Sequence, residues 1–346
     1  MSKTLQDYAT LINDTIQSNE INHYITTDNM CQNLGGIDTF KNINIPQGKV
    51  RSFQKDDVLL SNIRLYFRKV YRAKQKGGCS SDVLVFRAKH IDSATLFAIL
   101  SSQIFTDYAC SGSQGSKMPR GNKTHIMDFK IPTINFTIAK IFNSIQNKIE
   151  NNHKINELLH TLAYKIYEYY FKYKPKNAKL EQIIIENPKS NIMVKNAQKT
   201  QDKYPFFTSG DNILSYPKAI IDGRNCFLNT GGNAGIKFYV GKASYSTDTW
   251  CICANEFSDY LYLLLSSIKT HINQSFYQGT SLKHLQKNLL KKYPIYMPST
   301  HEIKKFNQII MPLLTLISIN TRTSKKLEQI RDFLLPLLLK QQVKPQ

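Results

Sequence analysis

The polar residues of this 346-residue chain do not fall into the spacings that catalysis requires. The Gly-rich segment Gly231 to Gly235 lacks the Lys-Ser/Thr that completes a phosphate-binding loop. His301-Glu302 is not followed by the second histidine of a zinc-protease helix. The sequence also lacks a methyltransferase Asn/Asp-Pro-Pro-aromatic element, a nuclease-type acidic cluster and a nucleophile spaced from a base. We therefore predict no catalytic residue, no metal ligand and no cofactor bound by this chain.

Binding chemistry is far better represented. Lys and Arg number 46 against 25 Asp and Glu, a net charge of +21, which points to a polyanionic partner such as nucleic acid. Eight basic residues lie between Arg51 and Lys76 against two acidic ones, with Tyr66, Phe67 and Tyr71 among them. Because neutralising phosphates takes several cations, this run predicts a nucleic-acid surface that includes Arg64, Tyr66 and Arg68.

Two Gly-containing loops offer cations and hydroxyls on a pliable backbone, the mixture that reaches phosphates and base edges. One runs from Gly115 to Arg120, and the other from Gly279 to His284. A minority interpretation of the turn from Gly231 to Gly235 is a close approach of its backbone to a ligand. The remaining DNA-binding candidates from these segments and their surroundings are Lys117, Arg120, Lys123, Gly232, Asn233, Lys242, Lys283 and His284.

The cysteines and the apolar segments indicate the compartment. The six cysteines contain no C-x-x-C pair and have no histidine spaced to complete a zinc set, so they are typical of reduced thiols. The longest apolar runs are much shorter than the roughly 20 residues of a membrane span, and the first ten residues lack a signal-peptide core. The prediction is a cytoplasmic protein that does not enter membranes.

An internal repeat sets the architecture. SSDVLVFRAKHIDSATLFAILSSQI, around Asp82, has a counterpart around Asp248, STDTWCICANEFSDYLYLLLSSI. Paired Ser-Ser, Gln-Gly and Pro positions recur in the same order at offsets of 164 to 166 residues, and apolar helix positions recur at 168. A collinear series of this kind predicts two tandem copies of one unit.

Each copy ends in a long helical pattern. Residues 138 to 170 carry an apolar heptad seam that includes Leu159 and Ile166, and the second helix carries Leu327 and Leu334. Asn152 and Asn320 occupy equivalent seam positions, where a buried polar contact could fix the register. We expect the two helices, each about 50 Å long, to pack antiparallel. Pro312 is expected to kink the second helix or to delay its start.

The expected fold class is α+β. Two globular α/β domains, at 1–135 and 176–298, alternate with spacer helices at 136–175 and 299–346, with an internal pseudo-two-fold repeat. In each globular part, β-rich runs precede one apolar helix, which begins near Ser93 in the first copy and near Asp259 in the second.

At these motifs the sequence resembles the specificity subunit of a type I restriction–modification system. In the first copy the resemblance rests on DDVLLSNIR from Asp56, GGCSSDVLVFR from Gly77 and GSKMPRGNKTHIMDFKIP from Gly115. In the second it rests on NTGGNAG from Asn229, YVGKASYSTD from Tyr239 and QGTSLKHLQKNLLKKYPIYMP from Gln278. The likeness covers nearly the whole chain, although the helix starts at Phe136 and His301-Glu302 depart from the family pattern.

The resemblance implies a non-catalytic protein that recognises a split, asymmetric site in double-stranded DNA. One half-site belongs to each globular domain, and the helices set their separation. It also implies assembly with two modification subunits, which would hold S-adenosylmethionine, and with restriction subunits, which would use ATP and Mg²⁺.

Other interpretations stay open at this point. The chain could be the specificity subunit of a type II-like enzyme, or a coiled-coil DNA-binding scaffold without sequence preference. It could also be a nuclease or methyltransferase with a degenerate site.

Overall fold

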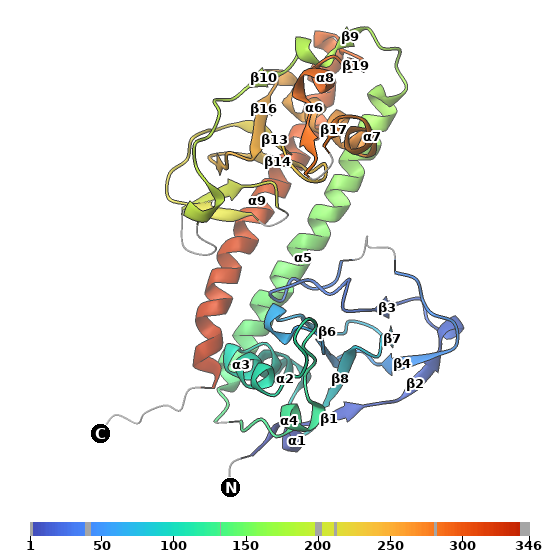
Figure 1. The fold of residues 1–346 in the computed structure, drawn as a ribbon, viewed down its shortest axis with the longest axis vertical. Helices are drawn as coiled ribbons and strands as arrows, with labels where there is room; N and C mark the ends of the chain where they lie inside the picture. Colours follow the sequence, from blue (N-terminus) through green and yellow to red (C-terminus); the bar gives the residue numbers. More distant parts are fainter. Residues whose placement is uncertain are drawn as a thin grey trace. The chain divides into compact units, whose positions relative to one another are not determined.

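A computed structural model describes residues 3–38, 43–131, 133–197, 203–210, 213–279 and 282–339 (Figure 1). The chain divides into two compact units. Unit 1 comprises 1–150 and 326–346, and unit 2 comprises 151–325. Both boundaries fall inside the long helices, because each helix pairs with the other within each unit. The units therefore differ from the sequence-based division, in which each spacer helix was a separate segment.

Unit 1 contains two four-stranded sheets. The first has the order β1-β8-β5-β6, and all its neighbouring strands are antiparallel. The second has the order β2-β4-β7-β3, with β3 parallel to β7. The bounds are β1 (Ala9–Ile12), β2 (Thr15–Gln17), β3 (Tyr24–Ile25), β4 (Lys49–Phe53), β5 (Val58–Ser61), β6 (Val70–Arg72), β7 (Gly77–Cys79) and β8 (Val83–Ala88).

Unit 2 repeats the main sheet of unit 1, and its second sheet has three strands instead of four. Its main sheet has the order β10-β16-β13-β14, again antiparallel throughout, and its second sheet pairs β11 with β12 and, in parallel, with β15. The shared strand order confirms the tandem repeat. The bounds are β10 (Ile185–Glu186), β11 (Tyr204–Phe207), β12 (Leu214–Tyr216), β13 (Arg224–Asn229), β14 (Ile236–Val240), β15 (Ser244–Tyr245) and β16 (Thr249–Cys253), with the two-stranded pairs β17 (Tyr277–Gln278) and β18 (His284–Leu285), and β9 (Ala178–Lys179) and β19 (Pro294–Ile295).

The expected single helix after each main sheet is two helices in both units. In unit 1 these are α2 (Ser93–Leu100) and α3 (Gln103–Ser111), and in unit 2 they are α6 (Ser258–Ser267) and α7 (Lys269–Ser275). The break falls at the paired serines, where the Ser102 hydroxyl accepts a hydrogen bond from the Phe105 amide and caps α3. The other short helices are α1 (Leu5–Tyr8), α4 (Lys123–Met127) and α8 (Lys287–Lys291).

The long helices are α5 (Phe136–Tyr167), which continues as a π-helix (Glu168–Lys172), and α9 (Thr300–Leu338). Ser299 and Glu302 form a reciprocal cap at the start of α9, because each side chain accepts the other's backbone N–H. Helix α9 passes through Pro312 without ending. The expectation that Pro312 delays the helix start was therefore wrong, since the cap fixes that start.

The helices run antiparallel within each unit, as expected (Figure 1). In unit 2, the Asn152 side chain donates to the Ser324 hydroxyl at 3.1 Å, and the Asn320 side chain donates to the side-chain oxygen Oδ1 of Asn156 at 3.0 Å. Asn152 and Asn320 therefore do not meet each other. Their partners, Asn156 and Ser324, are themselves 168 residues apart, so the two hydrogen bonds are copies related by the repeat. Both hydrogen bonds fix the relative register of α5 and α9.

The buried face of α9 drifts away from the predicted heptad positions. Leu327 and Leu334 are only half-buried in unit 1, whereas Arg331 and Leu335 are buried. A straight helix repeats every 3.6 residues, so its contact face moves away from a strict seven-residue pattern over several turns. Arg331 donates to the Gln146 side chain of α5 at 3.0 Å, a register contact that the apolar pattern did not predict.

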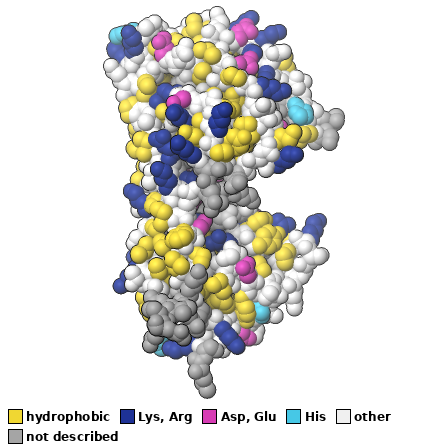
Figure 2. All heavy atoms as spheres, turned by 90° about the vertical axis from the view of Figure 1, so that its left-hand side faces the viewer, with side chains coloured by type: hydrophobic (Ala, Val, Ile, Leu, Met, Phe, Trp, Pro, Cys, Tyr) yellow, Lys and Arg dark blue, Asp and Glu magenta, His cyan; other side chains and the backbone are white. Residues whose placement is uncertain are grey.

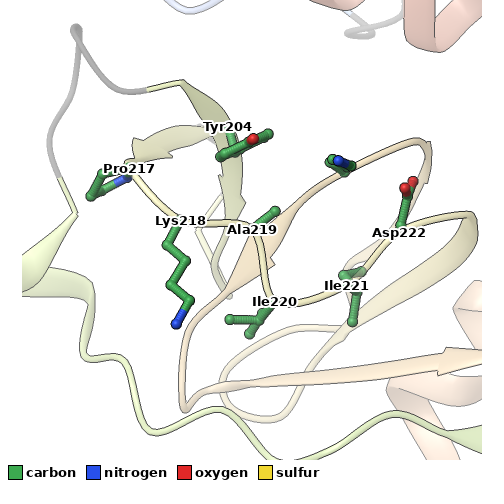
Figure 3. Close-up of a pocket in the computed structure, with 8 residues that line it drawn as sticks. Tyr204, Pro217, Lys218, Ala219, Ile220, Ile221 and Asp222 are labelled. Carbon is green, nitrogen blue, oxygen red and sulfur yellow. The ribbon is translucent and has the colours of Figure 1, made fainter.

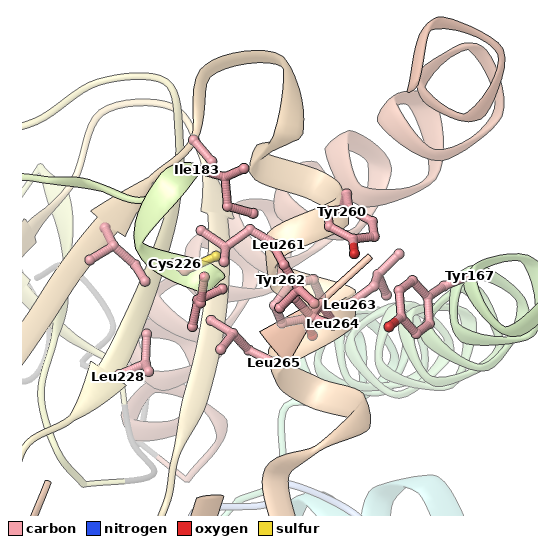
Figure 4. Packing of buried hydrophobic residues seen from close by; sticks show 14 of the residues in the cluster. Tyr167, Ile183, Cys226, Leu228, Tyr260, Leu261, Tyr262, Leu263, Leu264 and Leu265 are labelled. Carbon is pink, nitrogen blue, oxygen red and sulfur yellow. The ribbon is translucent and has the colours of Figure 1, made fainter. Parts of the chain in front are cut away.

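The core of unit 2 joins its main sheet to both long helices. Figure 4 shows α6, with Tyr260 to Leu265, between the strand that carries Cys226 and Leu228 and the helix that carries Tyr167. Leu159 and Ile166 of α5 are half-buried and pack against this cluster, in agreement with their predicted seam positions. A separate core of unit 1 includes Ala139 and Phe142 of α5 and Leu335 and Leu338 of α9.

Candidate nucleic-acid interface

Three backbone segments meet at one end of the main sheet in unit 1. They are the loop after β5, the turn before β8 and the hairpin from Gln114 to Arg120. The Gln114 and Arg120 amides each donate to the other's carbonyl, at 2.9 and 2.8 Å, and close the hairpin. The Arg64 amide donates to the Pro119 carbonyl and the Gly121 amide to the Asn62 carbonyl, at 2.9 and 3.1 Å. These bonds fasten the hairpin to the end of the sheet.

Unit 2 repeats the same hydrogen bonds at equivalent positions. Gln278 pairs with His284, 164 residues after Gln114 and Arg120. The Gly232 amide donates to the Lys283 carbonyl at 2.9 Å, and the Leu285 amide donates to the Thr230 carbonyl at 3.0 Å. Gly232 has a φ of 79° and Arg64 a φ of 52°, so both copies use a left-handed residue here. The Gly-rich loop and the second basic loop, predicted separately, therefore form one surface.

The side chains of the unit 1 surface mix exposed cations with an exposed ring. Tyr66 is 53% exposed, and its ring centroid lies 4.7 Å from that of Phe67. The Arg64 guanidinium lies 6.0 Å from the Phe67 ring and donates to the Lys117 carbonyl. Lys117, Arg120 and Lys123 are exposed. An exposed ring among cations is suited to contact bases and phosphates together.

Arg120 is an exposed cation of this surface with an ion-pair partner. Its guanidinium Nη2 lies 3.0 Å from the Asp82 carboxylate, while its side chain is 60% exposed. Asp82 is itself fixed, because its carbonyl accepts the Asn62 amide at 2.8 Å. The ion pair with Asp82 places the guanidinium beside the hairpin, and most of the Arg120 side chain stays open to a ligand.

Arg68 and several other cations between Arg51 and Lys76 contact groups of unit 1 itself. Arg68 donates to the Ser101 carbonyl at 2.9 Å, and burial lowers the pKa of its guanidinium. The others bind within unit 1: Arg51 contacts the Val83 carbonyl, Arg72 contacts Asp56 and Lys74 contacts Glu150. Much of this run therefore stabilises the unit, and as a set it offers fewer free charges than the sequence suggested.

In unit 2 the exposed candidates are Asn233, Lys283 and His284, beside Gly232. Lys242 is exposed but lies past the other end of β14, about 17 Å away for a five-residue strand. There it lines an open pocket with Tyr204, Pro217 and residues 218–222 (Figure 3). The structure therefore separates Lys242 from the other candidates.

Figure 2 shows one face of the molecule, on which Lys and Arg side chains gather over unit 2. Within the described ranges, no group of three His, Cys, Asp or Glu residues could hold a metal ion. None of the helices described is long and apolar enough to cross a membrane.

A family model and solved structures match this chain. Residues 176–329 match the model described as the type I restriction modification DNA specificity domain. This segment is similar to that DNA specificity domain. The resemblance predicted from the sequence is thereby confirmed for the second copy. The loops at Gly231 and Lys283 lie within the matched residues, and their contact with DNA stays a prediction. No curated protein matches the chain significantly.

The whole fold is similar to that of a crystal structure of a type-I restriction-modification system S subunit from M. genitalium. The two share 14% identity with a TM-score of 0.63, over 99% of this chain and 96% of that one. The crystal structure of the HsdS subunit from Thermoanaerobacter tengcongensis is 14% identical, over 98% of this chain and 96% of that one, with a TM-score of 0.37. The expected fold, two α/β domains with two long helices, is confirmed.

The sequence did not identify Asp82 or Gln114 as parts of the surface of unit 1, although Gln114 closes the hairpin with Arg120 and Asp82 pairs with the Arg120 guanidinium. The signal that locates them is the repeat itself, since Asp82 and Gln114 recur as Asp248 and Gln278 of the segment that matches the family model. The part played by the individual side chains in DNA binding stays a prediction.

Arg120 provides the direct test. If it contacts a guanine edge, Arg120→Ala should cost about 1–3 kcal/mol of binding and relax one position of the DNA site. If it contacts phosphate, affinity should fall for all sequences and the salt slope should decrease by about one. Arg120→Lys separates the two, because lysine keeps the charge but loses the two-pronged donor. Binding measured against salt with unchanged affinity and slope would place Arg120 away from DNA.

Proposed function

We propose that the chain is the DNA-recognition subunit of a type I restriction–modification complex and that each unit reads one half of a split site in double-stranded DNA. The observation that carries the proposal is the match of residues 176–329 to the DNA specificity domain, together with the same hydrogen-bonded surface in unit 1. Two similar surfaces with different side chains, Arg64 and Arg120 against Gly232 and His284, are suited to two different half-sites.

The charge of the chain supports duplex DNA as the ligand. A net charge of +21 favours binding to a polyanion, and exposed cations flank the hairpins of both units. Phosphate contacts would position each unit, and the side chains at the hairpins would contact base edges.

Helices α5 and α9 offer a docking face for the modification subunits in unit 2. His160 of α5 contacts Tyr262 of α6, and Ser318 of α9 contacts the Val240 amide of β14, so one side of the helix pair faces the globular part. Exposed apolar residues lie on the side turned away, because residues two apart on a helix point about 200° apart. These are Ile155, Leu158 and Leu162 of α5 and Ile309 and Leu316 of α9.

Within the proposed complex this chain has no catalytic part. Two modification subunits would bind S-adenosylmethionine and methylate adenine, and restriction subunits would bring ATP and Mg²⁺. The repeat supports two copies of the modification subunit, since pseudo-two-fold symmetry lets one chain present equivalent sites to identical partners.

The test is co-expression with a candidate type I modification subunit, followed by purification and mapping of methylated adenines. The expected result is a complex with two modification subunits per chain and methylation at one split, asymmetric site. Leu158→Asp with Leu316→Asp should abolish the complex, because it puts charges into a desolvated interface. Met193→Asp, at an exposed methionine of the globular part, is the matched control and should leave the complex intact.

Other results would contradict the proposal. Binding to DNA without sequence preference and without a modification subunit would identify a scaffold. Cleavage or methylation of DNA by the isolated chain would identify an enzyme.

A further inference from the structure

Both hairpins expose one large apolar side chain at the same place. Met118 is 56% exposed in unit 1, and Leu282, 164 residues later, is 58% exposed in unit 2. Exposed cations lie next to each: Lys117 and Arg120 beside Met118, and Lys283, followed by the exposed His284, beside Leu282.

The backbone of each hairpin holds this residue in place. Gly115 and Gly279 have φ values of 100° and 139°, which favour glycine. A Cβ added at Gly115 would lie 3.5 Å from the Met118 carbonyl oxygen, and one added at Gly279 would collide with the Leu282 carbonyl oxygen. The carbonyl of the apolar residue is therefore turned towards the glycine in both copies. The next residue is anchored through its own carbonyl, which accepts the Arg64 amide in unit 1 and the Gly232 amide in unit 2.

A single exposed apolar residue is ordinary on a protein surface. Here the apolar character recurs at equivalent positions while its neighbours change, from Pro119 to Lys283 and from Arg120 to His284. Loop tips accept small and polar residues readily, so the fold itself does not require a large apolar side chain there. The recurrence points instead to an apolar surface on the ligand.

Cations lie beside both apolar residues, Lys117 and Arg120 near Met118 and Lys283 next to Leu282, which favours an anionic ligand. Duplex DNA combines the two properties, with phosphates outside and apolar base faces within the stack. Proteins that bend DNA insert Leu, Met, Ile or Phe between base steps and partly unstack them. We propose that Met118 and Leu282 are apolar wedges, each of which enters a base step of the half-site read by its own unit. The proposal rests on the proposed function.

The experiment uses the full chain in complex with its modification subunits. A library of duplexes with randomised positions first defines the site bound by the wild type. Met118→Ala and Leu282→Ala should each bind the selected duplex about tenfold more weakly, the usual scale of one lost base-pair contact. Preference should relax in one half-site for each variant, with an unchanged salt slope since no charge is removed. Met118→Leu should retain affinity, and Met193→Ala serves as the control for truncating an exposed methionine.

Duplexes carrying 2-aminopurine at successive positions locate the opened step. Fluorescence should rise at one step of each half-site with the wild type, and Met118→Ala should suppress the rise in one half only. If both alanine variants had the affinity and fluorescence of the wild type, the inference would be overturned and the proposed function would stand. Loss of the modification subunits from these variants would also overturn the inference, since it would place the residues in a protein interface. Failure of the wild type to select any sequence would overturn the proposed function, and the inference with it.

Discussion

Phe306→Ala is expected to lower the free energy of unfolding of unit 2 by about 3–5 kcal/mol, the usual cost of removing a buried aromatic side chain. Phe306 of α9 is fully buried where α9 meets the end of α5. Its ring centroid lies 4.9 Å from that of Phe171 and 6.0 Å from that of Tyr170. Truncation leaves a cavity in this aromatic cluster and also weakens the pairing of the two helices.

The matched control is Phe333→Ala on the same helix. Phe333 is 71% exposed, so its truncation should change stability by less than about 0.5 kcal/mol. Urea unfolding followed by circular dichroism measures both variants, and separate transitions for the two units would show which one is affected. Equal destabilisation by Phe306→Ala and Phe333→Ala would contradict the packing described for α9.

The repeat was the part of the fold most accessible from sequence. Paired serines, glycines and prolines at nearly constant offsets predicted two copies, and the hydrogen bonds at Gln114 and Gln278 occupy equivalent positions. The offsets between the two copies stay nearly constant because the same backbone needs the same residue types at its turns and in its core. The offsets did not predict that the Gly-rich loop and the basic loop of unit 2 form one surface. Hydrogen bonds from Gly232 to Lys283 and from Leu285 to Thr230 join them.

The sequence could not predict which cations are exposed and which bind other groups of the protein. Arg68 and Arg120 look alike in a basic sequence, yet Arg68 donates to a backbone carbonyl while Arg120 is largely exposed. Which carbonyl or carboxylate lies within reach depends on long-range packing that residue spacing does not encode. The same limit explains Lys242, whose distance from the surface depends on the length and direction of β14, and Arg331, a charged residue buried by contact with Gln146.

Lengthening both long helices by one heptad is expected to move the methylated site. Seven residues would be inserted between Glu150 and Asn151 in α5 and between Lys325 and Lys326 in α9, where the two units divide. This placement keeps the contact of Arg331 with Gln146 in unit 1, and all of the α5–α9 contacts of unit 2, in register. Each helix gains about 10 Å, equivalent to roughly three base pairs of duplex. If the helices set the distance between half-sites, the complex should stop methylating its original site.

The variant should then either methylate a site with a spacer about three base pairs longer or bind no split site at all, since each added base pair also rotates one half-site around the duplex. Insertion into α5 alone is the matched control. This insertion moves residues of α5 by about 10 Å along the helix relative to their partners on α9, so the variant should be less stable than the wild type. The variant with both insertions should unfold at nearly the wild-type temperature. Thermal melting and methylation mapping distinguish these outcomes. A folded double-insertion variant that still methylates the original site would show that α5 and α9 do not act as the ruler.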